Sequence, residues 1–291
     1  MEQIGFIGLG NMGGQVAKAI CAKGYPTTVF DIDPKALSEF DGIAQIAESE
    51  KDVLKNSEII LLSLPSSKIV EPILDIFIEE GVSNKIIFDT STSYPPSTKK
   101  YYEIIKAKEG YLADGPISGM PSQAEQGKLM CMFGGDLEVY ERLKPLVDCF
   151  ADRYPNMGGS GNGHITKLVF NFIAMSYVNI YAMSFSLTEH MGLDNNLLFE
   201  LLKTTGMGCG IMNFYAPKMI NKTYDMAFAL ELAHKDLTYV KSMFESYQVP
   251  AYALDGILDM LRTSIRDGKG KQDYSACIST MNEFFKLGSA K

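Results

Sequence analysis

Ile4-Gly-Phe-Ile-Gly-Leu-Gly-Asn-Met-Gly13 is the stretch that decides the fold of this 291-residue chain. Its first four residues are mostly apolar and predict a short buried strand, and the periodicity of residues 15–23 predicts a helix directly behind the glycines. A second apolar run, Thr27 to Phe30, predicts another strand and is followed by Asp31. Strand, glycine-rich turn, helix, strand and acid occur in the order that a dinucleotide-binding βαβ unit requires.

The glycines of this stretch fit the pattern G-x-G-x-x-G. The first permits a tight turn, the second lets backbone approach a pyrophosphate, and the third lets the helix pack closely on the strand. The N-terminus of the helix then offers free N–H groups and a partial positive charge to the phosphates. We therefore expect the cofactor to lie against five residues of the turn: Gly8, Gly10, Asn11, Met12 and Gly13.

Asp31 favours NAD over NADP as that cofactor. It lies about 20 residues beyond the glycines, where a carboxylate can hold both hydroxyls of the ribose. A 2′-phosphate at this point would face Asp31 and Asp33, with only Lys35 nearby to offset their charge. An NADP site usually supplies an arginine here, and this stretch has none.

Apolar strand-like runs continue to alternate with helical runs up to Gly134-Gly135. The expected strands and helices are 58–64, 69–78, 85–90, 96–108 and 111–114. This alternation predicts a doubly wound parallel sheet, the Rossmann type of α/β fold. Because ligands bind at the carboxyl ends of such strands, the loops with Leu64-Pro65 and Thr92 should line the crevice.

The pattern changes after Gly158-Gly-Ser-Gly-Asn-Gly163, the strongest linker signal in the chain. Only helical periodicities follow, at 164–191, 195–203, 213–221, 228–247, 251–266 and 274–286. We therefore predict two domains joined through a long helix. They are an NAD-binding Rossmann domain at 1–161 and an all-α domain for substrate and oligomerisation at 162–291.

Composition narrows the possible partners and compartments. The net charge of −8 argues against nucleic acid or an anionic membrane as a bulk partner. Five scattered cysteines without a C-x-x-C pair suit reduced thiols in the cytoplasm, and three histidines without H-x-x-x-H spacing argue against a metal site. The N-terminus, with Glu2 and a very short apolar run, does not resemble a signal peptide.

Leu168 to Thr188 carries no charge and is long enough to cross a bilayer. Its polar residues, among them Asn171 and Asn179, are unfavourable in lipid, so a long helix buried on most sides is the better interpretation. Such a helix has more apolar surface than one small domain readily covers, which predicts a homodimer or homotetramer.

Lys167 and Asn171 are the side chains with the most evident chemistry. They lie one turn apart on the predicted long helix, so a cation and an amide share one face. Alcohol dehydrogenation needs a base for the hydroxyl proton, and lysine can serve where burial or a neighbouring charge, such as Lys235, lowers its pKa from about 10.4. On spacing alone, a snorkelling lysine beside a polar spacer is the more ordinary interpretation.

The sequence around this pair resembles the β-hydroxyacid dehydrogenase family, which includes the 3-hydroxyisobutyrate dehydrogenases. Gly161-Asn-Gly-His-Ile-Thr-Lys-Leu-Val-Phe-Asn171 is similar to the family's segment G-x-G-x-x-x-K-x-x-x-N. Other similar segments follow the family's order along nearly the whole chain: 5–13, 89–92, 114–119, 233–237 and 268–276.

The resemblance implies a role for each matched position. Lys167 would be the catalytic acid/base, and Asn171 would orient the lysine and the substrate. Ser118, through its hydroxyl, and Gly119, through its backbone N–H, would hold the substrate carboxylate. Four further positions would lie along the cofactor or close over its nicotinamide end: Leu64, Pro65, Thr92 and Lys235.

Without the family, some residues have plainer interpretations. Ser118-Gly119 could be an ordinary strand-exit turn, and Lys235 could form a solvated Lys-Asp pair. His164, one turn before Lys167, could touch the site. Asp273 is better interpreted as an N-cap of the last helix than as a catalytic acid.

The chain also departs from the family pattern. The family usually follows Ser-Gly with a third glycine, where this chain has Met120 and then Pro121. Met120 therefore joins the predicted substrate-binding residues, and specificity cannot be inherited from the best-known members. The second asparagine common after the lysine is replaced by Phe170, and the glycine-rich segment 206–212 could be a substrate-facing loop or an irregular helix connection.

These observations predict NAD-dependent oxidation of a small 3-hydroxy carboxylic acid to its semialdehyde or oxo acid, or the reverse reduction. The alternatives are an NADPH-linked semialdehyde reductase of the same family and a non-catalytic NAD-binding sensor. Oxidative decarboxylation, as in 6-phosphogluconate dehydrogenases, is disfavoured because Ala174 stands where those enzymes carry a proton-donating glutamate. Imine reductases lose the lysine that this chain keeps.

Overall fold

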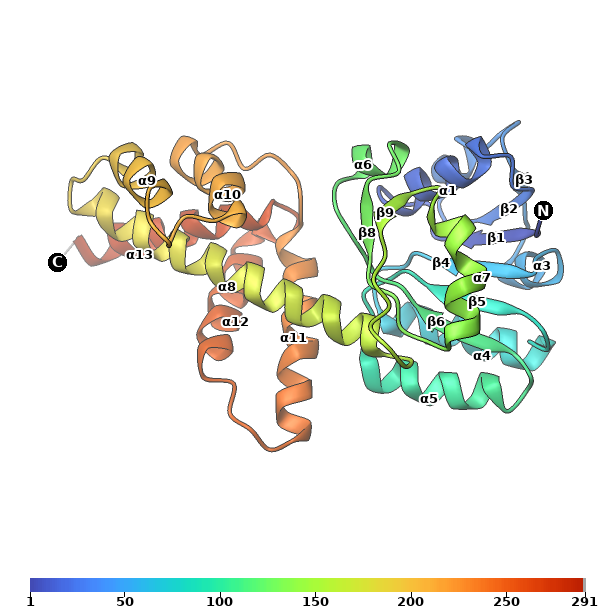
Figure 1. Cartoon of the computed structure of the whole chain (residues 1–291). Helices are drawn as coiled ribbons and strands as arrows, with labels where there is room; N and C mark the ends of the chain where they lie inside the picture. The colour runs from blue at the N-terminus through green and yellow to red at the C-terminus, as the bar shows by residue number, and fades with distance from the viewer. Residues whose placement is uncertain (290–291) are drawn as a thin grey trace. The chain divides into compact units, whose positions relative to one another are not determined.

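A six-stranded parallel sheet forms the centre of the first part of the chain in the computed structural model, which describes residues 1–289 (Figure 1). Its spatial order is β3-β2-β1-β4-β5-β6, so the strand order reverses between β1 and β4. The strands are β1 (Ile4–Ile7), β2 (Thr27–Phe30), β3 (Gln45–Ile46), β4 (Ile59–Leu62), β5 (Ile86–Asp89) and β6 (Tyr111–Asp114). Because all are parallel, their carboxyl ends lie along one edge, where a doubly wound sheet binds its ligand.

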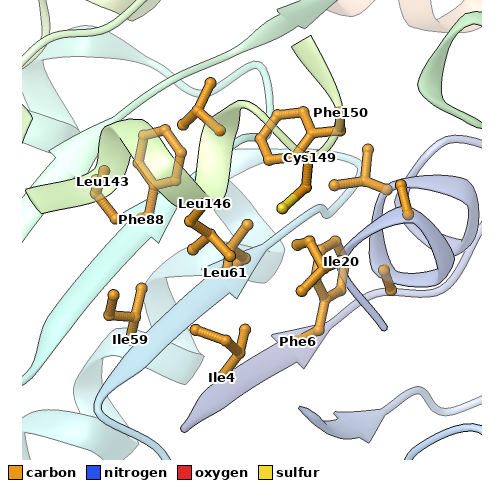
Figure 2. Close-up of a cluster of buried hydrophobic side chains, with 14 of the residues drawn as sticks. Ile4, Phe6, Ile20, Ile59, Leu61, Phe88, Leu143, Leu146, Cys149 and Phe150 are labelled. Carbon is orange, nitrogen blue, oxygen red and sulfur yellow. The ribbon is translucent and has the colours of Figure 1, made fainter. Parts of the chain in front are cut away.

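Helices cover both faces of this sheet, and alternate residues of the central strands β1, β4 and β5 enter the two cores. On one face Phe6 and Leu61 pack with α1 and α7, as Figure 2 shows. On the other face Ile60 and Leu62 pack with α3, α4 and α5. Two covered faces explain why the strands are continuous apolar runs. These helices are α1 (Gly13–Ala22), α3 (Glu50–Lys55), α4 (Ser67–Glu80), α5 (Pro95–Lys106) and α7 (Leu137–Val147).

A second, three-stranded sheet completes this part of the chain. β8 (Leu129–Cys131) pairs antiparallel with β7 (Ile117–Ser118) and parallel with β9 (Ala151–Arg153). The short helix α6 (Pro121–Glu125) connects β7 to β8, and α2 (Pro34–Ser38) follows β2.

Helices and short helical turns form the described part of the second unit. A core of buried apolar side chains, including Phe185 and Leu237, holds them together. The helices are α8 (Asn162–His190), α9 (Asn195–Lys203), α10 (Gly210–Asn221), α11 (Leu230–Ser246), α12 (Tyr252–Ser264) and α13 (Cys277–Ser289). A π turn, Ile265–Lys269, and a 3₁₀ turn, Tyr274–Ala276, lie between α12 and α13.

The chain divides into two compact units, Met1–Lys167 and Leu168–Lys291. The division falls within α8, later than the linker-based boundary at residue 161. The physical reason lies in the first turn of α8, where Gly161 and His164 donate their backbone N–H groups to Asp114 of the first unit.

The long helix α8 is buried on one side only. By length and composition it could cross a membrane, but half of its most apolar window is buried within the chain. Its other side exposes apolar side chains, each at least two-fifths accessible: Val169, Phe170, Ile173, Tyr177, Ile180, Met183 and Leu187. This single chain covers one face of the helix and leaves the other open, so burial on most sides, with cover from a second subunit, stays a prediction.

The predicted fold class is confirmed, a Rossmann sheet followed by helices. The helix predicted at 195–203 has those bounds, and the strand predicted at 58–64 is shorter, at Ile59–Leu62. Helix α7 and the short elements α2, α3, α6, β3, β7 and β9 were not predicted from the sequence. Each of these short elements has six residues or fewer, too few for periodicity to distinguish it.

Candidate active site

Contacts that only glycine permits shape the turn after β1. Gly8 has a φ of +97°, and a Cβ there would lie 2.2 Å from the carbonyl oxygen of Ser63. A Cβ on Gly13 would lie 2.1 Å from the carbonyl oxygen of Gly8. Around Gly10, in contrast, a Cβ would meet nothing within 4 Å. Open space therefore faces the backbone where a pyrophosphate is expected to approach.

The N-terminus of α1 lies directly behind this turn. Met12 occupies the N-cap position without making a side-chain cap, and the first turn of α1 holds no acidic residue. Asn11, beside it, is exposed. The backbone N–H groups at this helix end are thus suited to an anionic ligand. The residues present fit the phosphates of a dinucleotide.

Asp31 follows β2 at the same edge of the sheet. Its carboxylate accepts the N–H of Leu9 at 2.6 Å and the N–H of Asp33 at 2.8 Å. Asp33 caps α2 by accepting the N–H of Lys35 at 2.9 Å. Each oxygen of Asp31 therefore has one backbone partner and keeps a lone pair for a ribose hydroxyl.

Ser91 connects the two loops that carry the other predicted cofactor residues. Leu64 donates its backbone N–H to the hydroxyl oxygen of Ser91 at 2.9 Å. Ser91 donates its own N–H to Asp89 at 2.9 Å. Pro65 is exposed on the first loop and Thr92 is half-buried on the second, so both predicted residues lie at the carboxyl edge of the sheet.

Ser118, Gly119 and Met120 form the end of β7 and the turn after it. Gly119 has a φ of +140°, and a Cβ there would lie 2.6 Å from the side chain of Leu129. The N–H of Met120 donates to Oε1 of Gln123 at 2.7 Å, so this donor is already engaged. The proline that follows occupies the first turn of α6, where a missing N–H costs no helical bond.

Lys167 lies in the second turn of α8 and is only 9 % exposed. Asn171 follows one turn later and is 6 % exposed. Its Nδ2 donates to Oδ2 of Asp236 at 2.7 Å. Because this bond fixes the amide, the carbonyl oxygen of Asn171 lies on the side away from Asp236.

Asp236, on α11, is a buried partner of the candidate residue Asn171 that was not singled out from the sequence. It is 2 % exposed, and its Oδ1 lies 3.0 Å from Nζ of Lys235. The solvated Lys-Asp pair considered as the plain alternative is therefore not what is observed, because the carboxylate is buried. A signal was present, since Asp236 is flanked by Ala233 and Leu237 on the buried stripe of an amphipathic helix.

Two other residues and one segment singled out from the sequence make contacts within the protein. His164 is fully buried, and both nitrogens of its ring have partners within the chain, the hydroxyl of Thr98 and the carbonyl of Ser91. Asp273 accepts the N–H of Ser275 at 3.1 Å and caps the 3₁₀ turn that leads into α13. Segment 206–212 runs from the connection after α9 into the first residues of α10, and the hydroxyl of Tyr181 donates to the carbonyl of Met207 at 2.5 Å.

Two family profiles cover most of the chain. The profile described as the NAD binding domain of 6-phosphogluconate dehydrogenase matches residues 3–159. The profile described as NAD-binding of NADP-dependent 3-hydroxyisobutyrate dehydrogenase matches residues 161–281. The chain belongs to the β-hydroxyacid dehydrogenase family. It is an oxidoreductase whose Rossmann domain binds a nicotinamide dinucleotide, and the resemblance identified from the sequence is confirmed.

Several named relatives are similar over nearly their whole length. The 3-sulfolactaldehyde reductase of Escherichia coli is 28 % identical, covering 96 % of this chain and 95 % of its own. The mitochondrial 3-hydroxyisobutyrate dehydrogenase of Drosophila melanogaster is 29 % identical, covering 97 % of this chain and 90 % of its own. The 2-hydroxy-3-oxopropionate reductase of Escherichia coli is 26 % identical, covering 96 % of this chain and 97 % of its own.

A solved structure shares the fold. The Mycobacterium tuberculosis 3-hydroxyisobutyrate dehydrogenase with L-serine has a TM-score of 0.89 at 22 % identity. The match covers 97 % of this chain and 99 % of that one.

Proposed function

We propose that this protein oxidises a small 3-hydroxy carboxylic acid to its semialdehyde or oxo acid with NAD, or catalyses the reverse reduction. The relatives are named for small anionic molecules that carry a hydroxyl or an aldehyde, which supports this substrate class. The observation that carries the proposal is the buried lysine on α8 with an oriented amide one turn later.

Lys167 would take the hydroxyl proton during oxidation and return it during reduction. Burial disfavours the charged form of an amine, and the neutral form is the one that accepts a proton. Asn171 would hold the lysine or the reacting hydroxyl with its carbonyl oxygen, because Asp236 fixes the amide from the other side. The nicotinamide of the bound cofactor supplies or accepts the hydride.

Ser118 and Gly119 would hold the anionic group of the substrate, one through its hydroxyl and the other through its N–H. The backbone N–H of Met120 would not serve as a third donor to this anionic group, because it already donates to the side chain of Gln123. The side chain of Met120 is 41 % exposed and would add an apolar wall beside the anionic group. We therefore expect a preference for a 3-hydroxy acid with a small apolar substituent.

For the cofactor, the two hydrogen-bonded carboxylates after β2 support NAD over NADP. An NADPH-linked semialdehyde reductase is the second candidate, because one matching profile is named for an NADP-dependent enzyme. Lys235 would act at the nicotinamide end, as the family resemblance implies.

The test compares Lys167→Ala with Lys99→Ala, a control at an exposed lysine beside the start of α8. NADH formation or consumption is followed with a panel of small 3-hydroxy acids and semialdehydes, and NADH binding is followed by fluorescence. We expect Lys167→Ala to lower kcat by about 10²- to 10⁴-fold with cofactor binding retained, and Lys99→Ala to match the wild type.

Two outcomes would overturn the proposal. Wild-type turnover by Lys167→Ala with NADH bound would remove the lysine from the proton chemistry. Tight NADH binding by the wild type, without turnover of any member of the panel, would support a cofactor sensor instead.

We also propose that the exposed apolar face of α8 binds a second copy of the chain, as a homodimer or homotetramer in the cytoplasm. The unbroken stripe of exposed apolar residues on this helix supports the proposal. Ile180→Glu places a charge in the middle of this stripe and should give monomers in analytical ultracentrifugation, whereas an unchanged mass would contradict this interface.

A further inference from the structure

A buried polar cluster lies at the start of α8, three residues before Lys167. Its centre is the His164 ring, which is 0 % exposed. Nδ1 lies 2.8 Å from the hydroxyl oxygen of Thr98, and Nε2 lies 3.1 Å from the carbonyl oxygen of Ser91. Because a carbonyl oxygen only accepts, Nε2 carries a proton and donates it. The ring therefore bridges the helix α5 and the loop after β5.

Two carboxylates from neighbouring strand ends flank this ring. Asp89 ends β5, with Oδ2 3.6 Å from Nε2, and Asp114 ends β6, with Oδ2 3.8 Å from Nδ1. Asp114 also accepts the N–H groups of Gly161 at 2.6 Å and of His164 at 2.8 Å. Burial raises the pKa of the Asp114 carboxyl, and the His164 ring and these two N–H groups offset part of that rise.

The cluster connects the start of α8 with the loops predicted to carry the cofactor. Ser91 accepts from His164 through its carbonyl oxygen and from the N–H of Leu64 through its hydroxyl oxygen. Residues three apart on a helix are neighbours on its surface, so His164 is adjacent to Lys167. A continuous chain of contacts thus runs from Leu64 through Ser91 and His164 to the first turn of α8, and Lys167 follows in the second turn.

We propose that His164 is a positioning residue: it fixes the first turn of α8 to Ser91 and Thr98 and so sets where Lys167 lies relative to the cofactor loops. The planar ring holds Nδ1 and Nε2 at a fixed separation, so a single orientation of the ring serves both partners. The inference rests on the proposed role of Lys167. It matters for catalysis because a misplacement of about 1 Å can cost about 100-fold in rate.

The test starts with His164→Phe, which fills similar space without a polar atom, and with Thr98→Val, which replaces the hydroxyl at Nδ1 with a methyl group. The matched control is Thr27→Val. Thr27 is also a buried threonine, but it lies at the amino end of β2 and its hydroxyl donates to the backbone carbonyl of Tyr25. We expect His164→Phe to lower kcat by about 10- to 100-fold, with the Kd for NADH changed less than about threefold. His164→Gln, which keeps a donor and an acceptor, should recover part of the loss, and Thr27→Val should leave kcat unchanged.

A double-mutant cycle separates positioning from general support of the fold. In a Lys167→Ala background, His164→Phe should lower the residual rate by less than about twofold, because a residue that acts through the lysine has nothing left to position. An equal loss in both backgrounds would overturn the inference. Wild-type activity of Lys167→Ala alone would instead overturn the proposed function, so the two failures are distinguishable. Should His164→Phe fail to fold, Thr98→Val takes its place in the cycle with the same expected pattern.

Discussion

Two helix N-termini of the first unit both follow glycine-rich sequence, yet their backbone N–H groups have different partners. α1 begins behind Gly10, with no side-chain cap and with open space beside that glycine. α8 begins behind Gly161, and the carboxylate of Asp114 binds its first N–H groups. The N–H groups at the start of α1 are suited to an anionic ligand, whereas those at the start of α8 donate to a carboxylate of the protein itself. A glycine-rich turn therefore indicates close backbone packing, and the neighbouring strand end determines which anion the helix receives.

Among the variants that test this comparison, Asp114→Ala should lower the free energy of unfolding most, because it removes the carboxylate that binds the start of α8. Two buried N–H groups would lose their acceptor, at about 1–3 kcal/mol each, so the free energy of unfolding should fall by about 2–6 kcal/mol. Urea denaturation followed by circular dichroism measures it. Asp33→Ala, which removes the exposed cap of α2, is the control and should cost about 1 kcal/mol. Equal losses in the two variants would show that the Asp114 cap is no stronger than a surface cap.

Gly13→Ala and Gly10→Ala test the open helix end. A Cβ at Gly13 would lie 2.1 Å from a carbonyl oxygen, whereas one at Gly10 meets nothing within 4 Å. We expect Gly13→Ala to lower the free energy of unfolding by about 1–3 kcal/mol. Gly10→Ala should change it by less than about 0.5 kcal/mol and yet weaken NADH binding about tenfold, because its methyl group occupies the ligand's space. Unchanged NADH binding by Gly10→Ala would place the pyrophosphate elsewhere.

Asp31→Ala tests whether the site at the start of α1 prefers NAD over NADP. Losing a charged hydrogen-bond acceptor for the ribose should cost NAD about tenfold or more in kcat/KM. NADP should gain, because its 2′-phosphate no longer meets this carboxylate. The ratio of the two kcat/KM values is the measurement, and Glu39→Ala, at an exposed carboxylate paired with Lys18, is the control. A ratio unchanged by Asp31→Ala would remove this residue from cofactor choice.

The pH dependence of Asp114 gives the smallest effect. Since burial raises its pKa above the ordinary 3.8, the folded protein binds this proton more tightly than the unfolded chain does. Ionisation of Asp114 therefore opposes folding at neutral pH, and this opposition disappears as the pH falls through the raised pKa. The difference in unfolding free energy between the wild type and Asp114→Asn should shift in favour of the wild type from pH 7 toward pH 4. A difference that is constant with pH would contradict the raised pKa.

The parts of the fold that were predictable depend on local pattern. The βαβ unit at 4–31 follows from periodicity and the placement of its glycines, and the helix at 195–203 follows from periodicity. Both patterns involve residues that are close together in the sequence. The contacts of His164 were not predictable in this way. Its position one turn before Lys167 suggested contact with the site, but its burial depends on Ser91 and Thr98, which are distant in sequence.

The candidate site shows the same limit. Met120 was recognisable as a departure from the family, but its hydrogen bond to Gln123 depends on how the short helix α6 turns. Asp236 was visible only as a charge on an apolar stripe. Its bond to Asn171 joins residues 65 positions apart, and no periodicity connects them.

The sequence alone identified a dinucleotide fold, its family and the lysine with its amide, because backbone sterics and short motifs act over a few residues. The partners of the buried charges emerged only from the folded chain. Asp114 accepts a hydrogen bond from Gly161, 47 residues away, because β6 ends beside the start of α8 in the folded chain. Burial makes such pairings energetically necessary, but strand order and helix packing select the partner.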